Sequence, residues 1–362
     1  MNVKRDELLA ALKLASLAVN NKETAPQSSF FMFTGDSIVG DNELLHTNIQ
    51  FKSGIVGAVK AEELNAILSK MTAPAVEMLQ EDDKLVFKVG RSKTSLNIYE
   101  LLREKVAYLD PIATEEDARE SGWVPAVETN TEINLGLEAS APCCSANLTN
   151  RALSGILLTP SGMVACDNFQ AIRVDTEMPL ISKAKFLKGQ LLIPASVVKA
   201  MMEIGFDSLW VNEEFKCFAS NSKTKNWIMF EAIDHTEIEY PDIQFLFDGE
   251  GSELDFPEGF IEAVKKAEVF AKNSLKSEEI YVHITMKAGV MTVFGEGANG
   301  SYEEQFDCDF AYDISFVAAP RTLEFLISKE GSSAELIMDE IPRIRFTNDQ
   351  FTYAITIETV GD

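Results

Sequence analysis

The chain has 362 residues, of which 46% are hydrophobic and 25% are charged, and its formal net charge is −25. This length fits three domains of about 120 residues each, and the negative charge argues against a simple basic nucleic-acid-binding surface. No signal peptide precedes the first amphipathic pattern, and no apolar run reaches membrane-spanning length, so we expect no membrane partner. Five cysteines without paired spacing predict free thiols in a reducing cytoplasm.

The first third of the chain begins with apolar residues at helical spacing, which predict a helix over 5–19. A strand is expected at 29–33, and a second helix at 60–71. Two further strands over 84–99, joined by turn-forming residues, predict a hairpin. The acidic, irregular stretch 101–122 is interpreted as a linker.

The middle third opens with an apolar strand at 123–127. Thr129 and Glu132 have the spacing of a capping box, which predicts the start of a helix. Gly136 and Pro142 disfavour a long helix, so we expect it to be short or kinked.

The stretch 191–205 is the clearest copy of a unit that occurs three times: an apolar strand, a small-residue break and a helix. The other copies lie at 55–71 and 314–331, and equally spaced glycine turns before apolar strands support the repeat: Gly35, Gly162 and Gly289. We therefore predict an α+β protein of three repeated domains, each with two helices packed on antiparallel sheets. Their predicted bounds are 1–121, 122–250 and 251–362.

Residues with the spacing of an active site are not found. Cys143 and Cys144 fall on an apolar helical face and are interpreted as core residues, and the glycine-rich stretch 295–300 as a hairpin turn. The three histidines lie in different domains, with no nearby nucleophile and no metal-ligand spacing: His46, His235 and His283. The sequence thus predicts no catalytic residue, no cofactor and no metal.

Charge is unevenly distributed along the chain. The six expected helices are together slightly positive, whereas the rest of the chain carries the acidic excess. Surface helices commonly favour lysine, which would explain the pattern simply. The same charge distribution also fits a protein whose helices face a polyanion while its strands form an acidic outer shell.

Several motifs in order resemble the bacterial DNA polymerase sliding clamps, the β subunit of DNA polymerase III. The stretch 14–26 resembles the family's first helix and loop, and 90–96 its first-domain hairpin. The segment 153–158 resembles the Leu-Asn-Gly strand, and Tyr240-Pro241-Asp242 the Phe-Pro-Asp motif before the third domain. The resemblance covers essentially the whole chain.

The resemblance implies a ring of two subunits that encircles double-stranded DNA without sequence preference and has no reaction of its own. Its implied partners are a DNA polymerase and an ATP-dependent clamp loader, and its implied dimer contacts are Val269 and Phe270, on a helix expected over 257–273. Residues implied to reach the DNA are Lys22, Lys70, Asn147, Arg151, Lys199, Lys265, Lys272 and Lys276.

The resemblance also implies a pocket that takes a short partner motif with apolar anchors. Its walls would be Leu153, Cys166, Asn168, Phe169, Ala171, Pro241, Phe245, Leu246, Ile355 and Ile357. Residues 168–171 depart from the family's Gly-His-Arg-Leu, and residues 356–362 from its usual ending. These departures fit a divergent clamp, such as one encoded by a phage.

Two other interpretations stay open. The net charge also suits an acidic DNA mimic or scaffold that binds DNA-binding proteins without encircling DNA. The second interpretation is an enzyme built on a repeated, strand-rich scaffold, although the sequence shows no active site for it.

Overall fold

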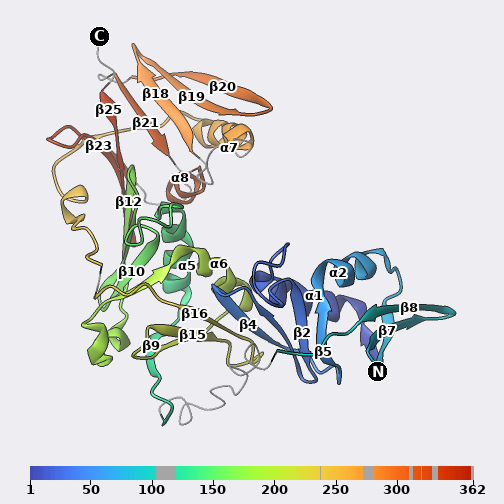
Figure 1. Ribbon diagram of the computed structural model, residues 1–362. Helices are drawn as coiled ribbons and strands as arrows, with labels where there is room; N and C mark the ends of the chain where they lie inside the picture. The colour runs from blue at the N-terminus through green and yellow to red at the C-terminus, as the bar shows by residue number, and fades with distance from the viewer. Residues whose placement is uncertain are drawn as a thin grey trace. The chain divides into compact units, whose positions relative to one another are not determined.

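The computed structural model describes residues 1–102, 120–236, 238–271, 281–309, 313–318, 320–327 and 333–359. It divides into two compact units (Figure 1). Unit 1 comprises Met1–Thr129 and Lys199–Ala232, and unit 2 comprises Asn130–Val198 and Ile233–Asp362. Each unit contains one eight-stranded antiparallel sheet and one smaller sheet.

The large sheet of unit 1 combines strands from the first two predicted repeats. Its order is β5 (Val56–Lys60), β2 (Phe30–Thr34), β3 (Ser37–Asp41), β4 (Leu45–Gln50), β16 (Trp227–Glu231), β15 (Lys216–Ser220), β14 (Ser208–Val211) and β9 (Val124–Glu128). The repeats meet where β4 pairs with β16. There the His46 ring stacks on Trp227 with centroids 5.3 Å apart, and its Nδ1 lies 3.2 Å from Asp41 Oδ2. His46 therefore has a structural place in this junction.

The smaller sheet of unit 1 has the order β1 (Asn2–Lys4), β6 (Ala75–Glu81), β7 (Lys84–Val89) and β8 (Ser92–Asn97). The predicted first helix is confirmed as α1 (Arg5–Ala15), continued by the 3₁₀ turn η1 (Ser16–Ala18). Its Leu8 and Leu12 are buried, as the helical spacing required. The second helix is α2 (Ala61–Lys70), which buries Leu64 and Leu68.

The large sheet of unit 2 repeats this arrangement. Its order is β13 (Leu191–Pro194), β10 (Gly155–Thr159), β11 (Gly162–Cys166), β12 (Gln170–Asp175), β24 (Phe351–Thr356), β23 (Arg343–Thr347), β22 (Ser333–Ile337) and β17 (Ser252–Glu253). The second and third predicted repeats meet where β12 pairs with β24. Because strands of neighbouring repeats share one sheet, the two units cut across the predicted domain bounds, which stay a prediction.

The smaller sheet of unit 2 has the order β20 (Gly300–Asp307), β19 (Val290–Gly297), β18 (Val282–Lys287), β21 (Ile314–Ala318) and β25 (Glu358–Thr359). The turn between β19 and β20 confirms that 295–300 is a hairpin. Helix α7 (Phe260–Ala271) packs on β19 and β20, and it also contacts α8 (Pro320–Ile327). Helix α6 (Ala195–Ile204) spans the boundary of the two units.

Helix α5 (Thr131–Ser140) corrects the predicted capping box. Its cap is Asn130, whose Oδ1 accepts a hydrogen bond from the Ile133 backbone N–H at 2.8 Å. Thr129 instead donates to the Phe206 carbonyl at 3.1 Å, so the prediction was wrong by one residue. The expected short helix is confirmed, since a 3₁₀ turn, η3 (Ala141–Cys143), follows it.

Gly136 explains how α5 approaches its sheet so closely. A Cβ atom at this position would lie 3.0 Å from Val174 Cγ1 and 3.1 Å from the Met163 side chain. The cost of glycine in a helix is therefore offset by packing on β11 and β12. Among the described helices, none is long and apolar enough to cross a bilayer.

Candidate functional site

Four stretches of unit 2 that lie far apart in sequence meet in one apolar cluster beside the β12–β24 junction. Pairing explains part of the meeting, because Cys166 lies opposite Ala171 and Ala171 lies opposite Ala354. Buried members are Cys166, Ala171, Ile243, Phe247 and Ala354, against which Leu153, Val164, Tyr240 and Leu246 pack half-buried. The structure thus brings together four of the predicted pocket residues: Leu153, Cys166, Ala171 and Leu246.

The surface near this cluster carries exposed residues from the predicted set. Phe169 is 43% exposed and Phe245 is 50% exposed, and Asn168 and Pro241 are also exposed. Large apolar side chains in such a setting are typical of a docking surface rather than of a sealed core. We call the cluster and these exposed residues the apolar site.

Ile355 and Ile357 lie in the interior and not at the surface of the apolar site. Both are buried, and Ile355 is completely so. Since neighbouring residues of a strand face opposite sides, Ile355 points away from the side on which Ala354 joins the cluster. The Ile357 backbone N–H donates to the Pro342 carbonyl at 3.0 Å. Both isoleucines are therefore core residues at the end of β24.

The loop that departs from the family motif is firmly held. Asp167 Oδ1 accepts the backbone N–H groups of Phe169 and Gln170 at 2.7 and 2.9 Å, and its Oδ2 accepts the Tyr281 hydroxyl at 2.6 Å. The Phe169 carbonyl accepts the Thr356 N–H at 2.8 Å and its hydroxyl at 2.9 Å. The exposed Phe169 ring therefore stands on a fixed backbone, which lowers the entropy cost of binding.

Arg343 on β23 holds the segment that carries Leu246. Its Nε donates to the Leu246 carbonyl at 2.9 Å, and its Nη1 donates to the Ile341 carbonyl at 2.7 Å and to Asp339 at 2.6 Å. Nη2 donates to the Asp248 carbonyl. The guanidinium is buried, and its hydrogen bond to Asp339 lowers the pKa of that carboxyl. One side chain thus fixes the 3₁₀ turn η6 (Gln244–Leu246) to the β22–β23 turn.

The sequence missed several cluster members, namely Val164, Tyr240, Ile243, Phe247 and Ala354. Burial raises the pKa of the Cys166 thiol to about 11, and this sulfur lies 3.5 Å from the Tyr240 hydroxyl. Such a thiol is a packing residue, since the thiolate is the reactive form. All five cysteines are free, and four of them, Cys308 excepted, are buried.

The residues predicted to reach DNA lie in both units. In unit 1, Lys22, Lys70 and Lys199 are exposed, and in unit 2, Asn147, Arg151 and Lys265 are exposed. Lys272 and Lys276 fall outside the described residues. Asn147 Oδ1 accepts hydrogen bonds from the Thr149 N–H and hydroxyl, so this side chain also shapes its own turn.

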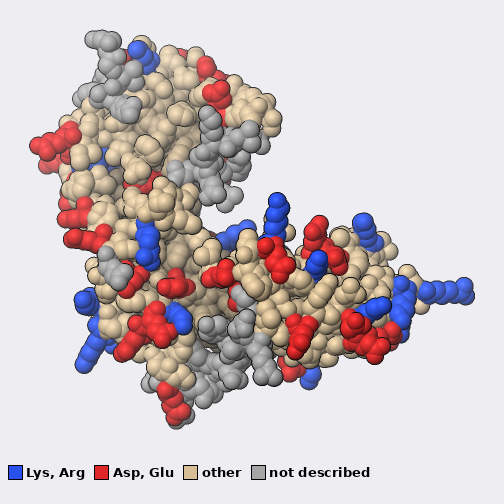
Figure 2. Space-filling view, in the orientation of Figure 1, with Lys and Arg blue, Asp and Glu red and all other residues tan. Residues whose placement is uncertain are grey.

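Lysines of the helices are partly balanced by carboxylates. Lys265 on α7 lies 2.8 Å from Glu324 on α8, and Lys13 on α1 lies 3.1 Å from Glu203 on α6. Acidic and basic side chains lie interspersed over α1 and α2 (Figure 2). Exposed pairs of this kind contribute little to stability, so these cations can exchange their partners for phosphates at small cost.

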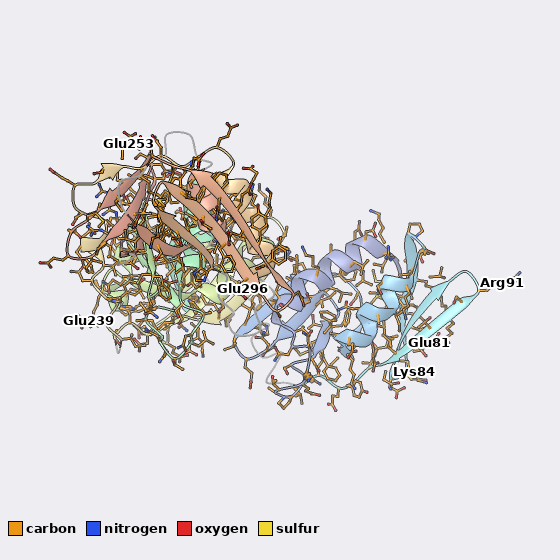
Figure 3. The ribbon with its side chains drawn as sticks, turned by 90° about the horizontal axis from the view of Figure 1, so that it is seen from above. Glu81, Lys84, Arg91, Glu239, Glu253 and Glu296 are labelled. Carbon is orange, nitrogen blue, oxygen red and sulfur yellow. The ribbon has the colours of Figure 1, made fainter. Side chains whose placement is uncertain are left out.

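Two edge strands present opposite charges. In the described residues β8 is the last strand of its sheet in unit 1, and Arg91 lies at the tip of the β7–β8 hairpin (Figure 3). Among the described strands, β20 is likewise the last of its sheet in unit 2, and it carries Glu303, Glu304 and Asp307. Edge strands expose backbone groups that can pair with another chain.

The predicted dimer residues lie next to β20. Val269 on α7 is 58% exposed, whereas Phe270 is half-buried. The Phe270 ring lies over the start of β20, since a Cβ at Gly300 would be 3.4 Å from its Cε1. Val269 thus offers an apolar surface close to an acidic strand edge.

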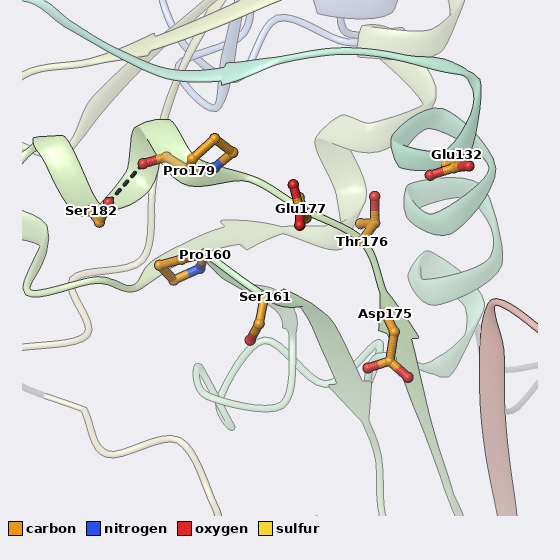
Figure 4. Close-up of a pocket in the computed structure, with 8 residues that line it drawn as sticks. All are labelled: Glu132, Pro160, Ser161, Asp175, Thr176, Glu177, Pro179 and Ser182. Atoms are coloured by element: carbon orange, nitrogen blue, oxygen red, sulfur yellow. Dashed lines mark hydrogen bonds between the residues drawn. The ribbon is translucent and has the colours of Figure 1, made fainter.

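A cavity of about 730 Å³ lies elsewhere in unit 2 (Figure 4). Three of its eight lining residues are acidic: Glu132, Pro160, Ser161, Asp175, Thr176, Glu177, Pro179 and Ser182. None of these belongs to the apolar site, and a lining with three carboxylates does not suit apolar anchors. Among the described side chains, no group of histidine, cysteine or acidic residues is placed to hold a metal ion.

Comparison by sequence finds no match: no protein-family model fits the chain, and no curated protein matches it. Comparison by structure does. The chain is similar to a DNA polymerase III β chain from Streptococcus pneumoniae, with 13% identity, a TM-score of 0.68 and 99% of both chains covered.

Two further solved structures are similar to the chain over the same extent. A β clamp from Helicobacter pylori bound to a DNA ligase peptide has 12% identity, a TM-score of 0.67 and 99% of both chains covered. A DNA polymerase sliding clamp from Bacillus subtilis has 14% identity, a TM-score of 0.65 and the same coverage. The predicted fold is therefore confirmed: the chain has the fold of the DNA polymerase III β sliding clamps.

Proposed function

We propose that the protein is a DNA polymerase processivity factor, a ring-shaped clamp that encircles duplex DNA and has no reaction of its own. The observation that carries this proposal is the sliding-clamp fold over 99% of the chain. The apolar site supports it, because a clamp needs a place at which its polymerase is tethered. Tethering raises the effective concentration of the polymerase at the template.

The ring is proposed to close head to tail from two copies. Strand β8 in unit 1 of one copy would pair with β20 in unit 2 of the other. Arg91 would then approach Glu303 and Asp307, as would Lys93 on exchanging its exposed ion pair with Glu81, and Val269 would be covered. Opposite charges on the two edges favour this heterologous pairing over β8–β8 or β20–β20 contacts.

DNA would lie against the helices. Lys22, Lys70 and Lys199 in unit 1, and Arg151 and Lys265 in unit 2, are exposed cations that can contact phosphates without reading bases. Because carboxylates such as Glu203 and Glu324 lie among the lysines, each phosphate contact is weak. Weak, sequence-independent contacts permit sliding, whereas a strongly basic lining would hold the DNA in one place.

A polymerase or a clamp loader would bind at the apolar site. An apolar side chain of its peptide would cover Leu153 and Leu246, beside the buried floor of Cys166 and Ala171. Phe169 and Phe245 would lose water on binding. Pockets of this kind concentrate binding energy in a few anchors.

Retention on circular DNA tests the proposal. The protein should remain on nicked circular plasmid through gel filtration at a salt concentration that removes ordinary phosphate contacts, and cutting the plasmid once should release it. The alternative of an acidic DNA mimic predicts no retention on either form. Equal retention on circular and linear DNA would contradict encirclement.

A further inference from the structure

Exposed carboxylates flank the Leu246 side of the apolar site on two segments. One is the segment before β17, where Glu239, Asp242, Asp248 and Glu250 are exposed. The other is the β22–β23 turn, with Asp339 and Glu340. We call these six residues the acidic rim. In Figure 2, acidic side chains gather along the edge of unit 2 that lies beside the strand labelled β23 in Figure 1.

The two segments of the acidic rim are joined directly beside Leu246. Arg343 donates to the Leu246 and Asp248 carbonyls from one segment, and to Asp339 and the Ile341 carbonyl from the other. The carboxylates therefore lie on elements that also position an apolar anchor surface.

The neighbouring arginines balance only part of the rim, because Arg343 pairs with Asp339 and the other two pair with carboxylates outside the rim. Arg343 is 2% exposed and donates hydrogen bonds to three carbonyls and to Asp339. Arg345 donates to the Phe247 and Gly249 carbonyls and pairs with Glu335. Arg173 lies over the Phe247 ring, 5.2 Å from its centroid, with Nε 3.4 Å from Asp175. Among the described residues these three arginines pair with one of the six rim carboxylates, Asp339, so the net charge around the site is negative.

Apolar residues stand exposed among these carboxylates. Phe245 is 50% exposed, Met338 is 41% exposed and Ile341 is 38% exposed. Apolar surface inside a charged rim is the usual composition of a protein-binding patch, in which the centre supplies affinity and the rim supplies specificity.

We propose that the apolar site takes a peptide segment whose apolar anchors are flanked by lysine or arginine. This inference rests on the proposed function, because it names the chemistry of the partner that docks there. Acidic flanks would bring like charges together at Asp242 and Glu340. Charge at the rim selects the partner and speeds its encounter, while the anchors supply most of the affinity.

The test uses three synthetic peptides with the same leucine and phenylalanine anchors, flanked on each side by two lysines, two serines or two glutamates. Fluorescence anisotropy with the full-length protein should rank them lysine, serine, glutamate, with about tenfold between the first two at low salt. The differences in affinity among the three peptides should become smaller at about 0.5 M salt, because exposed charges are screened. Equal affinities, or tighter binding of the glutamate peptide, would overturn the proposal.

Variants locate the effect on the rim. Asp242→Asn with Glu340→Gln should weaken the lysine peptide several-fold and leave the serine peptide unchanged. Glu62→Gln, at an exposed glutamate of α2 in unit 1, is the matched control. Unchanged lysine-peptide binding by the double variant would overturn the proposal while leaving the docking site intact. Failure of all three peptides to bind would reject the docking site itself.

Discussion

Arg343 Nε donates a hydrogen bond to the carbonyl oxygen of Leu246, at 2.9 Å. The two residues are far apart in sequence, and the bond ties a predicted pocket residue to a strand of the third repeat. Because Arg343 is buried, it holds the apolar site in shape without contacting a partner.

Replacing Arg343 by methionine should therefore affect both stability and binding. The carbonyls of Leu246, Ile341 and Asp248 would lose their donor inside the protein, which should lower the free energy of unfolding by about 3 kcal/mol. Denaturant unfolding measures the first effect. Peptide anisotropy measures the second, and we expect weaker binding under conditions where the variant is still folded. A variant as stable as the parent would show that the bonds contribute nothing.

Asp339 makes part of this stability depend on pH. Its hydrogen bond from Arg343 holds the pKa of the carboxyl below its ordinary value of 3.8. A carboxyl with a lowered folded-state pKa stabilises the protein above its unfolded pKa, and this contribution is lost as the pH falls through the folded value. The parent should therefore lose more stability between pH 5 and pH 3 than Asp339→Asn does. Parallel pH profiles of melting temperature would contradict the assignment.

Leu246→Asp tests the apolar site. A carboxylate in place of the half-buried leucine should cost more than about 2 kcal/mol of peptide affinity, a loss of roughly thirtyfold. Ring formation should persist. Leu44→Asp, at an exposed leucine of unit 1, is the matched control and should bind normally. Unaltered binding by Leu246→Asp would place the partner site elsewhere.

The alanine pair Val269→Ala and Phe270→Ala tests assembly. Loss of a packed apolar contact typically costs a few kcal/mol, so sedimentation should detect folded monomers at concentrations where the parent is a dimer. Val56→Ala, at a valine of similar exposure in unit 1, should remain dimeric. A double variant that stays a dimer at low concentration would rule out this helix as the interface.

Charge reversal of Lys22 and Arg151 tests the DNA contacts. The double glutamate variant should be retained less well on circular DNA, and its retention should depend less steeply on salt, because fewer counterions are released. Reversal of Lys183 and Lys188, exposed lysines that the proposal does not place at DNA, is the control. If the first variant is retained like the parent, the helices do not face DNA.

Much of the fold could be predicted because the threefold repeat can be recognised in the sequence. Periodicity located α1 and α2 correctly, and the turn formers located the β7–β8 and β19–β20 hairpins. The sheets that join neighbouring repeats could not be predicted. Pairing of β4 with β16, and of β12 with β24, joins strands that are far apart in sequence and have no shared turn to signal them.

The candidate site was predictable only in part. Resemblance to sliding clamps pointed to Leu153, Cys166 and Leu246, which do lie together. It could not indicate that Ile355 is completely buried, because alternation along β24 depends on the register of the pairing. Nor could it identify Arg343, whose role arises from four backbone and side-chain contacts made across the fold.

The most direct test of encirclement is a covalently closed ring. Cysteines introduced at Lys93 on β8 and Gln305 on β20, in a Cys308→Ser background, would be joined by a flexible bis-maleimide after dimers form around nicked circular plasmid. We predict protein that stays with the circular DNA in denaturing detergent and is released when the plasmid is cut once. Crosslinked dimer that separates from the circular plasmid in detergent would contradict the proposal that the protein encircles DNA.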